Sequence, residues 1–583
     1  MKKIGLTIVL ISILLNVFAN ESNDTIRVVI DLKQVDSLGL KIQVYPPSDL
    51  FGKIEYKFPK SIPGIYEYLN SHKSLITLKQ NNVEINCVEN SFLIDADIKN
   101  NVIAYSSESS VKKMNNISAE DTYFLKDSIY ILNWHYLLGF FKNETKRPYK
   151  IEITKKSKLF GTGSLAKNTI NDTLDIFYAT DYKNLIHSPL MYNVPDTTMF
   201  RIGETNFAIS CVGNDTLLNS NKIRDLIYKP LAEIYSKSLF KHKEYSFLYF
   251  SDYSLLTPYL TGLEHPNSTL ICYHSALLNN NILISSSIHE YIHAIYAPLR
   301  IRSEMINGFN FINPKCDEFL WFYEGVTEYL SIKTLVKSGF FEPEDFFNEL
   351  DESNKYHKNI NFNKLSSNIY GNRGQKQFDN FYTKGSLFAL HLDLEILNRS
   401  HGNTDLFDVM QKLQELYSPD KPFNTKTFID DFSSASGVDI NEYIYQNTQK
   451  KKKIDYIGLL ANMGYEKKLK DSLIWSFKPS KIHTVLNFKK DRLELAFFGS
   501  IINEVCNSRK VSVYEINGES LTWYNYDKLI VPTNDDEILL KARVNDEEIE
   551  FSVKPEQILR KKKFVYWKKN ENNKTILAIN YWK

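Results

Sequence analysis

Two histidines and a glutamate between them are the residues of this chain best suited to chemistry. Residues 289–293 read His-Glu-Tyr-Ile-His, an H-E-x-x-H motif inside an apolar stretch with helical spacing. Residues four apart share one face of a helix, so the imidazoles of His289 and His293 can reach a single Zn²⁺ ion. Glu290 can then accept a proton from water at that ion. The motif predicts a catalytic zinc site, with two hydrogen-bonded histidines on a packed helix as the alternative.

A second acidic residue further along the chain could complete the site. Glu324 lies in the mainly apolar segment 319–328, which predicts the buried start of a helix. A carboxylate there needs a partner, and a third ligand leaves the fourth zinc position open for catalysis. We therefore expect one Zn²⁺ held by His289, His293 and Glu324. The alternative is a solvated Glu324 in a first helical turn. Glu328, one turn later, is either solvated or a hydrogen-bond acceptor for a zinc-bound histidine.

Several further motifs accompany these residues in a fixed order. Residues 321–325 read Trp-Phe-Tyr-Glu-Gly, and residues 382–385 read Tyr-Thr-Lys-Gly. Residues 262–269 contain Gly-Leu-Glu-His and Asn-Ser-Thr, and residues 58–66 contain Phe-Pro and Ile-Pro-Gly-Ile-Tyr. The set resembles the glycyl aminopeptidase family of gluzincin zinc metallopeptidases, in which the glutamate of W-x-x-E-G is the third zinc ligand.

The resemblance implies roles for two more side chains. Glu264 is implied to bind the free α-ammonium of a peptide, which would make the enzyme an aminopeptidase. The hydroxyl of Tyr382 is implied to donate to the oxyanion that forms during hydrolysis. A salt bridge in a loop is the alternative for Glu264, and a packed aromatic ring is the alternative for Tyr382. The family further implies a preference for small amino-terminal residues, Gly or Ala.

The spacing of apolar residues divides the chain into three parts that must position this site. Short alternating runs separated by Asn, Asp, Gly and Pro predict a β-rich domain over residues 22–210. Apolar residues three and four apart predict a mainly helical domain over residues 211–464. Alternation returns over residues 465–583. We expect a multidomain α+β protein, and the resemblance implies a β-sandwich-like domain, a thermolysin-like catalytic domain and a PDZ-like β domain.

The first residues predict export from the cytoplasm. Lys2 and Lys3 precede an apolar run that ends at Phe18, and Ala19 follows before a polar segment. This order is typical of a signal peptide, here residues 1–19, and predicts a secreted or periplasmic protein. The alternative is an uncleaved membrane anchor, although the run is shorter than the roughly 20 residues of a spanning helix.

Composition excludes several other classes of protein. The 71 Lys and Arg residues nearly balance 69 Asp and Glu residues, so the net charge of +2 argues against a nucleic-acid partner. Hydrophobic residues make up 43% of the chain, which predicts packed domains rather than disorder. The five cysteines are odd in number and lack C-x-x-C spacing, so they predict neither a disulfide scaffold nor a thiolate zinc site.

These observations together predict an exported aminopeptidase that uses one Zn²⁺ and acts on peptides. Two alternatives stay open at this point. One is an endopeptidase with the same metal site. The other is a catalytically silent peptide-binding protein on a peptidase scaffold, whose PDZ-like domain recognises a protein partner.

Overall fold

The computed structural model of the chain describes residues 24–569 with interruptions. Outside the described residues lie 36–38, 70–74, 89, 99, 110–117, 214–218, 252–259, 274–279, 345, 348–359, 451–455, 463, 477–480, 488–491, 499–509, 522–533, 535 and 545–546. The predicted signal peptide, residues 1–19, also lies outside them. In the described part of the chain, every helix is too short or too polar to span a bilayer.

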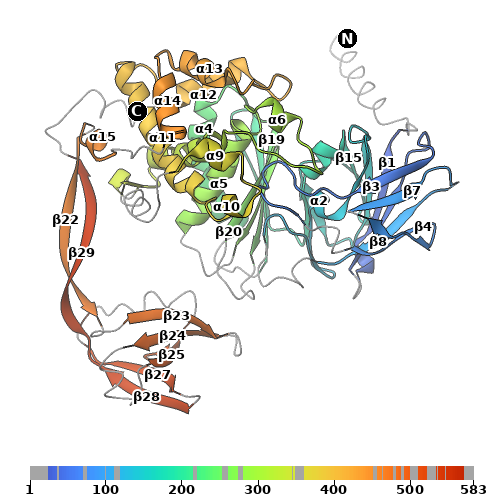
Figure 1. Cartoon of the computed structure of the whole chain (residues 1–583). Coiled ribbons are helices and arrows are strands. Elements are labelled where there is room, and N and C mark those ends of the chain that lie inside the picture. The colour runs from blue at the N-terminus through green and yellow to red at the C-terminus, as the bar shows by residue number, and fades with distance from the viewer. Residues whose placement is uncertain are drawn as a thin grey trace, which may run out of the picture.

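Strands build the N-terminal domain, drawn in blue to cyan in Figure 1. Its eight-stranded sheet has the order β14 (Ala166–Asn171), β15 (Leu174–Ala179), β12 (Tyr149–Thr154), β1 (Ile26–Asp31), β2 (Leu40–Tyr45), β8 (Ile103–Ser107), β4 (Leu75–Gln80) and β5 (Val83–Glu84). Alternate residues of β1 are buried, as expected when one face of a strand packs on a core. The predicted β-rich N-terminal domain is confirmed.

Two smaller sheets and short helices complete this domain. One sheet has the order β13 (Phe160–Gly163), β16 (Leu190–Asn193), β10 (Ile129–Leu132) and β9 (Tyr123–Leu125). The other has the order β11 (Phe140–Phe141), β3 (Lys53–Lys57), β7 (Ser91–Asp95) and β6 (Cys87–Val88). The helical turns are η1 (Leu32–Gln34), α2 (Trp134–Leu137) and α3 (Tyr182–Ile186).

A five-stranded sheet lies between the N-terminal domain and the helices. Its order is β17 (Thr197–Ile202), β18 (Thr205–Gly213), β19 (Glu244–Ser251), β21 (Ser268–Tyr273) and β20 (Leu260–His265). The three central strands are parallel, and the edge strands β17 and β20 each run antiparallel to their neighbour. The boundary predicted at residue 210 falls inside β18, because β18 pairs with β19 further along the chain.

Helices cover one face of this sheet and confirm the mainly helical middle of the chain (Figure 1). Helices α4 (Ser220–Lys237) and α5 (Asn280–Ile295) pack on the sheet itself. The other helical elements of this part are α6 (Glu304–Asn307), the π-helical turn η5 (Trp321–Val326), α7 (Thr327–Lys337), α9 (Phe362–Ser366), α10 (Asn372–Gln375), α11 (Asn380–Arg399), α12 (Leu406–Leu416), α13 (Phe428–Ser436), α14 (Asn441–Thr448) and α15 (Tyr456–Asn462).

Strand β19 shows why the sheet sits between two cores. Phe247 and Tyr249 belong to the core shared with the helices, whereas Leu248 and Phe250 belong to the core of the N-terminal domain. Successive side chains of a strand point to opposite faces, so this strand is buried on both sides. Such a strand is a continuous apolar run rather than an alternating one. The N-terminal domain is therefore packed directly behind the sheet that carries the site.

The C-terminal part consists, in its described residues, of strands. Strands β22 (Tyr465–Ser476) and β29 (Glu556–Lys569) form an antiparallel ribbon that leads away from the helices in Figure 1. The ribbon reaches a sheet of β23 (Lys481–Asn487), β24 (Arg492–Phe498), β25 (Lys510–Ile516), β27 (Ile538–Val544) and β28 (Glu547–Val553), with β26 (Glu519–Ser520) on β25. The PDZ-like architecture of this part stays a prediction.

Candidate active site

Helix α5 presents the two histidines of the H-E-x-x-H motif to one point. Ile288 and Ile292 are buried in the catalytic core and fix the rotation of the helix. On the adjacent face of the helix, Nε2 of His289 lies 3.0 Å from Nε2 of His293. Both rings are nearly fully buried. The predicted helix and the predicted convergence of the two imidazoles are therefore present.

Glu324 approaches the same point from the π-helical turn η5. Its Oε2 atom lies 3.3 Å from Nε2 of His293 and 3.6 Å from Nε2 of His289. A π-helical turn inserts one extra residue, a feature found frequently at functional sites. Glu324 is only 2% exposed, so it is not the solvated residue of the alternative interpretation. Burial alone would raise the pKa of Glu324, but the facing imidazoles lower it well below its ordinary value.

The three side chains fit a divalent metal ion by their spacing. Ligands arranged tetrahedrally at 2.0–2.1 Å from an ion are roughly 3.3 Å from one another. The observed separations of 3.0, 3.3 and 3.6 Å scatter around that value. Nitrogen and oxygen donors of this kind are the usual ligands of Zn²⁺. The donor set is also the one cluster of metal-ligating side chains found among the described residues.

Hydrogen bonds outside the cluster determine which nitrogen atom of each imidazole is left to bind a metal ion. Nδ1 of His293 lies 2.7 Å from the carbonyl oxygen of Ala297, and Nδ1 of His289 lies 2.6 Å from Oε2 of Glu328. Both Nδ1 atoms must donate to these acceptors. With each Nδ1 atom donating, the Nε2 atom of each ring is the one left to bind a metal ion. Glu328 is thus the acceptor that the sequence suggested as one of two interpretations.

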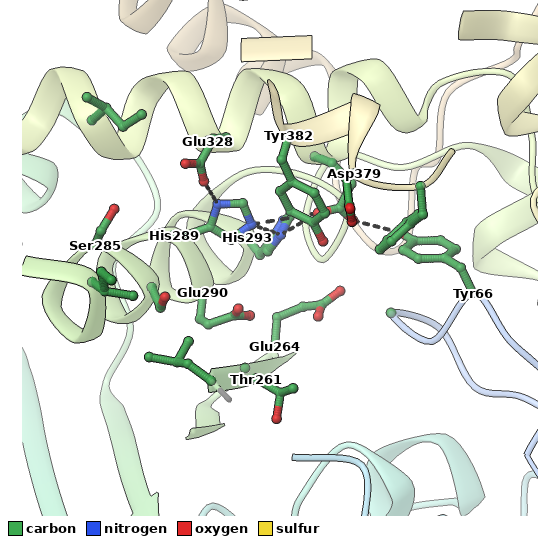
Figure 2. Close-up of a pocket in the computed structure, with 18 of the residues that line it drawn as sticks. Tyr66, Thr261, Glu264, Ser285, His289, Glu290, His293, Glu328, Asp379 and Tyr382 are labelled. Atoms are coloured by element: carbon green, nitrogen blue, oxygen red, sulfur yellow. Dashed lines mark hydrogen bonds and ion pairs between the residues drawn. The ribbon is translucent and has the colours of Figure 1, made fainter. Parts of the chain in front are cut away.

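Glu290 lies beside the cluster with its carboxylate in the cavity shown in Figure 2. It is 8% exposed, and burial raises its pKa above the ordinary value. Gly262 of strand β20 lies against it: a Cβ atom at Gly262 would lie 2.3 Å from Oε1 of Glu290. The edge strand therefore touches the predicted general base through a residue that has no side chain.

Glu264 lies two residues further along β20 and also faces the cavity (Figure 2). The side chain is buried on a strand, so the loop salt bridge of the alternative interpretation is absent. Burial first, and then the charges of Glu290 and Glu324, raise the pKa of Glu264 to about 8. Gly64 of the N-terminal domain has a φ of 93° and lies so close that a Cβ would meet Oε1 of Glu264 at 2.7 Å.

Two tyrosines border the cluster. The ring of Tyr382, at the start of α11, lies 5.6 Å from the ring of His289, and its hydroxyl group faces the cavity in Figure 2. Burial, then the nearby carboxylates, raise the pKa of Tyr382 well above its ordinary value, which keeps the phenol a donor. Tyr66 was given no role by the sequence. Its hydroxyl donates to Oε1 of Glu324 at 3.0 Å, across 258 positions of the chain.

The sequence feature that could have indicated a role for Tyr66 is its position in the Ile-Pro-Gly-Ile-Tyr stretch shared with the family.

Three other polar residues, His265, Arg300 and Arg302, lie outside the cavity. His265 faces His187, with their Nδ1 atoms 3.4 Å apart, and does not line the cavity. Arg300 lies over the ring of Phe240, and Arg302 is buried elsewhere, so neither reaches the place of a substrate next to the cluster.

The cavity that these residues surround has a volume of about 880 Å³ and a strongly acidic wall. No lysine or arginine is among its described lining residues. Its carboxylates belong to Glu67, Glu120, Glu264, Glu290, Glu324, Glu328 and Asp379. Glu120 belongs to the N-terminal domain. Its partial burial, and then the charges of neighbouring carboxylates, raise its pKa to about 8. Such a wall favours cationic groups of a ligand.

Comparisons with known proteins agree with this geometry. The model of the Peptidase M61 N-terminal domain matches residues 27–193, and the model of the M61 glycyl aminopeptidase matches residues 283–388. No curated protein matches the chain. The solved structure of an aminopeptidase N family protein from Idiomarina loihiensis is 18% identical, covers 96% of this chain and 100% of its own, and has a TM-score of 0.70. That likeness shows a shared fold.

Two more distant structures align over large parts of the chain. An M1 zinc metallopeptidase from Deinococcus radiodurans is 8% identical, with 74% of this chain and 94% of its own covered and a TM-score of 0.44. Aminopeptidase A of Legionella pneumophila is 13% identical, with 92% and 58% covered and a TM-score of 0.45.

Proposed function

Because the chain belongs to the M61 glycyl aminopeptidase family of metallopeptidases, we propose that it is a zinc aminopeptidase that removes amino-terminal residues from peptides. His289, His293 and Glu324 would hold one Zn²⁺ ion at the wall of a cavity that can accept the first residues of a peptide. When bound, the ion supplies Lewis acidity, which acidifies water and polarises the scissile carbonyl group.

The burial of Glu264 without a partner side chain is the observation that supports an exopeptidase rather than an endopeptidase. Its carboxyl group is buried at the cavity wall, with no hydrogen bond or ion pair from another side chain in the described part of the chain. Burial first, and then the charges of Glu290 and Glu324, raise its pKa to about 8, and the described lining of the cavity includes no lysine or arginine to pair with it. The α-ammonium of an unblocked peptide supplies a cation and is held next to the metal cluster. An acetylated amino terminus leaves the buried carboxyl group unpaired.

Proton transfer falls to Glu290. Its carboxylate borders the cavity beside the histidine pair and has a pKa above its ordinary value, so it binds a proton more readily than an exposed glutamate. It takes a proton from the attacking water and delivers that proton to the nitrogen of the leaving peptide. The amine then departs as the carbon–nitrogen bond breaks. Such a general base typically contributes about 10²- to 10⁴-fold to the rate.

Tyr382 stabilises the charge that develops on the carbonyl oxygen. Its phenol stays protonated because the surrounding carboxylates oppose ionisation. A hydroxyl donor aimed at the developing oxyanion strengthens as negative charge accumulates there. Loss of one such donor typically costs about 3 to 4 kcal/mol of transition-state stabilisation.

The family points to Gly or Ala as the preferred first residue, and the acidic wall adds an electrostatic criterion. With no lysine or arginine among the described lining residues, an aspartate or glutamate side chain at the amino terminus would meet uncompensated carboxylates. We therefore expect glycyl and alanyl peptides to be the best substrates and glutamyl peptides the worst.

Chromogenic aminoacyl anilides of Gly, Ala and Glu, each free and acetylated, test this function with the purified protein. We expect hydrolysis of the free glycyl and alanyl anilides, inhibition by a chelator, recovery with one equivalent of Zn²⁺, and a loss on the order of 100-fold on acetylation. Equal hydrolysis of blocked and free peptides would identify an endopeptidase. A protein without stoichiometric zinc and without hydrolysis would be a silent binding protein.

The two ends of the chain support two further parts of the proposal, which are export and the binding of a protein partner. The segment 1–19 supports export to the periplasm or the cell exterior. The strands after Tyr465 suit a PDZ-like module, for which a peptide ligand would be a protein partner. Amino-terminal sequencing of the protein recovered outside the cytoplasm would locate the cleavage site, which we expect after Ala19.

A further inference from the structure

One segment of the N-terminal domain reaches into the metal cluster. Residues 61–66 follow strand β3 and end at Tyr66, which borders the cavity in Figure 2. The hydroxyl of Tyr66 donates to Oε1 of Glu324 at 3.0 Å, while Oε2 of the same carboxylate faces the histidines. The two oxygens of Glu324 thus have different partners, one from each domain.

The position of Tyr66 is fixed by the catalytic domain on several sides. Gln375 donates through Nε2 to the carbonyl oxygen of Tyr66 at 2.5 Å. The ring of Phe378 packs against the ring of Tyr66, with centroids 5.5 Å apart. Tyr370 donates through its hydroxyl to the carbonyl oxygen of Ile65 at 3.1 Å. Backbone and ring are therefore held from both ends, and the phenol hydroxyl has a defined direction.

A carboxylate ligand needs such a constraint. A free glutamate can rotate about its terminal torsion or bind a metal through both oxygens, which would fill the coordination position that catalysis requires to be open. A hydrogen bond to the second oxygen selects the one-oxygen mode and orients the ligand, as outer hydrogen bonds commonly do at metal sites.

We propose that Tyr66 is a positioning residue of the metal site, by which the N-terminal domain holds Glu324 in a one-oxygen binding mode. This inference rests on the proposed function, since it requires a metal at His289, His293 and Glu324. It also makes the N-terminal domain a part of the catalytic apparatus rather than a neighbouring module.

Zinc binding to the full-length apoprotein tests the proposal independently of turnover. Competition with a chromophoric chelator gives the dissociation constant for Zn²⁺ of wild type, Tyr66→Phe and the control Tyr182→Phe. Tyr66→Phe keeps the ring and removes the hydroxyl, so we expect zinc binding about 10- to 100-fold weaker. Tyr182→Phe removes a buried hydroxyl that donates to the carbonyl oxygen of Leu138, next to the ring of Phe311. This hydroxyl contacts neither Glu324 nor the segment that ends at Tyr66, so we expect wild-type affinity.

X-ray absorption of the zinc-loaded proteins gives a second measurement. Wild type should show one carboxylate oxygen at the metal, and Tyr66→Phe should show an added contribution from a second oxygen. Equal zinc affinity and equal absorption spectra of Tyr66→Phe and wild type would overturn the proposal, as would equal weakening in both variants, which would mark an interface effect. A wild-type protein that binds no zinc would instead overturn the proposed function itself.

Discussion

The backbones of Gly325 and Gly385 pack directly against each other. A Cβ atom at Gly325 would lie 2.7 Å from the Cα atom of Gly385, and a Cβ at Gly385 would lie 2.9 Å from the Cα atom of Gly325. Gly325 follows Glu324 in the turn η5, and Gly385 lies one helical turn after Tyr382 in α11. The contact between the two glycines therefore sets the distance between the predicted third ligand and the predicted oxyanion donor.

Gly385→Ala should separate these two elements. The added methyl group has no space next to the backbone of Gly325, and overpacking of a core typically costs about 1 to 3 kcal/mol. We expect that loss in the free energy of unfolding, measured in urea, together with a lower kcat because Tyr382 moves with α11. Gly371→Ala is the control, since its nearest neighbour, the carbonyl oxygen of Asn368, is 3.4 Å away. Equal stability and turnover of the two variants would contradict this account.

Glu290→Gln should separate catalysis from metal binding. The amide fills the same volume next to Gly262 but cannot accept a proton from water. We expect kcat to fall by about 10²- to 10⁴-fold while the protein keeps one equivalent of zinc and its melting temperature. Metal analysis and anilide hydrolysis of one preparation measure both. Substantial turnover by this variant would show that another group takes the proton.

Glu328 should govern the affinity for zinc through His289. Its carboxylate accepts from Nδ1 of His289, so its removal frees the imidazole to rotate and to change tautomer. We expect Glu328→Ala to bind zinc about 10- to 100-fold more weakly. Glu328→Gln keeps an oxygen acceptor at the same position and should lie between Ala and wild type. If Ala and Gln bind zinc equally well, the hydrogen bond is not what orients His289.

The sequence could predict the metal cluster because its geometry is local to two helices. The i and i+4 spacing of His289 and His293 follows from helix periodicity alone. The apolar surroundings of Glu324 indicated a buried carboxylate. The π-helical turn that directs this carboxylate was not predicted, because one inserted residue in a turn leaves no mark on the apolar pattern.

Strands β19 to β21 were missed for a different reason. Strand β19 is buried on both faces, so its apolar residues do not alternate, and a short apolar run of this kind resembles a helical segment. The alternative interpretation of Glu264, a salt bridge in a loop, has the same origin, because Glu264 lies on strand β20. The contact between Tyr66 and Glu324 depends on the packing of two domains, which periodicity within either domain cannot reveal.

His391 should make the stability of the catalytic domain depend on pH. It lies on α11 with 4% of its surface exposed, and burial lowers its pKa from 6.5 to about 3. The unfolded chain takes up a proton as the pH falls below about 6.5, whereas the folded protein does not until about pH 3. The contribution of His391 to the free energy of unfolding is therefore fully present above pH 6.5 and is lost as the pH falls toward 3.

Urea unfolding of wild type and His391→Leu at pH 7.5 and 5.5 measures this contribution. The effects of carboxylates that titrate in both proteins cancel when the pH-dependent changes in unfolding free energy of the two proteins are subtracted. We expect the change in unfolding free energy between the two pH values to differ by about 1.4 kcal/mol, with the wild type losing more stability at pH 5.5. His401→Asn is the control, because His401 is exposed and asparagine tolerates its φ of 54°. An identical pH dependence in His391→Leu and wild type would show that this imidazole, whose Nδ1 lies 3.4 Å from the hydroxyl of Tyr443, takes up a proton in the folded protein as readily as in the unfolded chain.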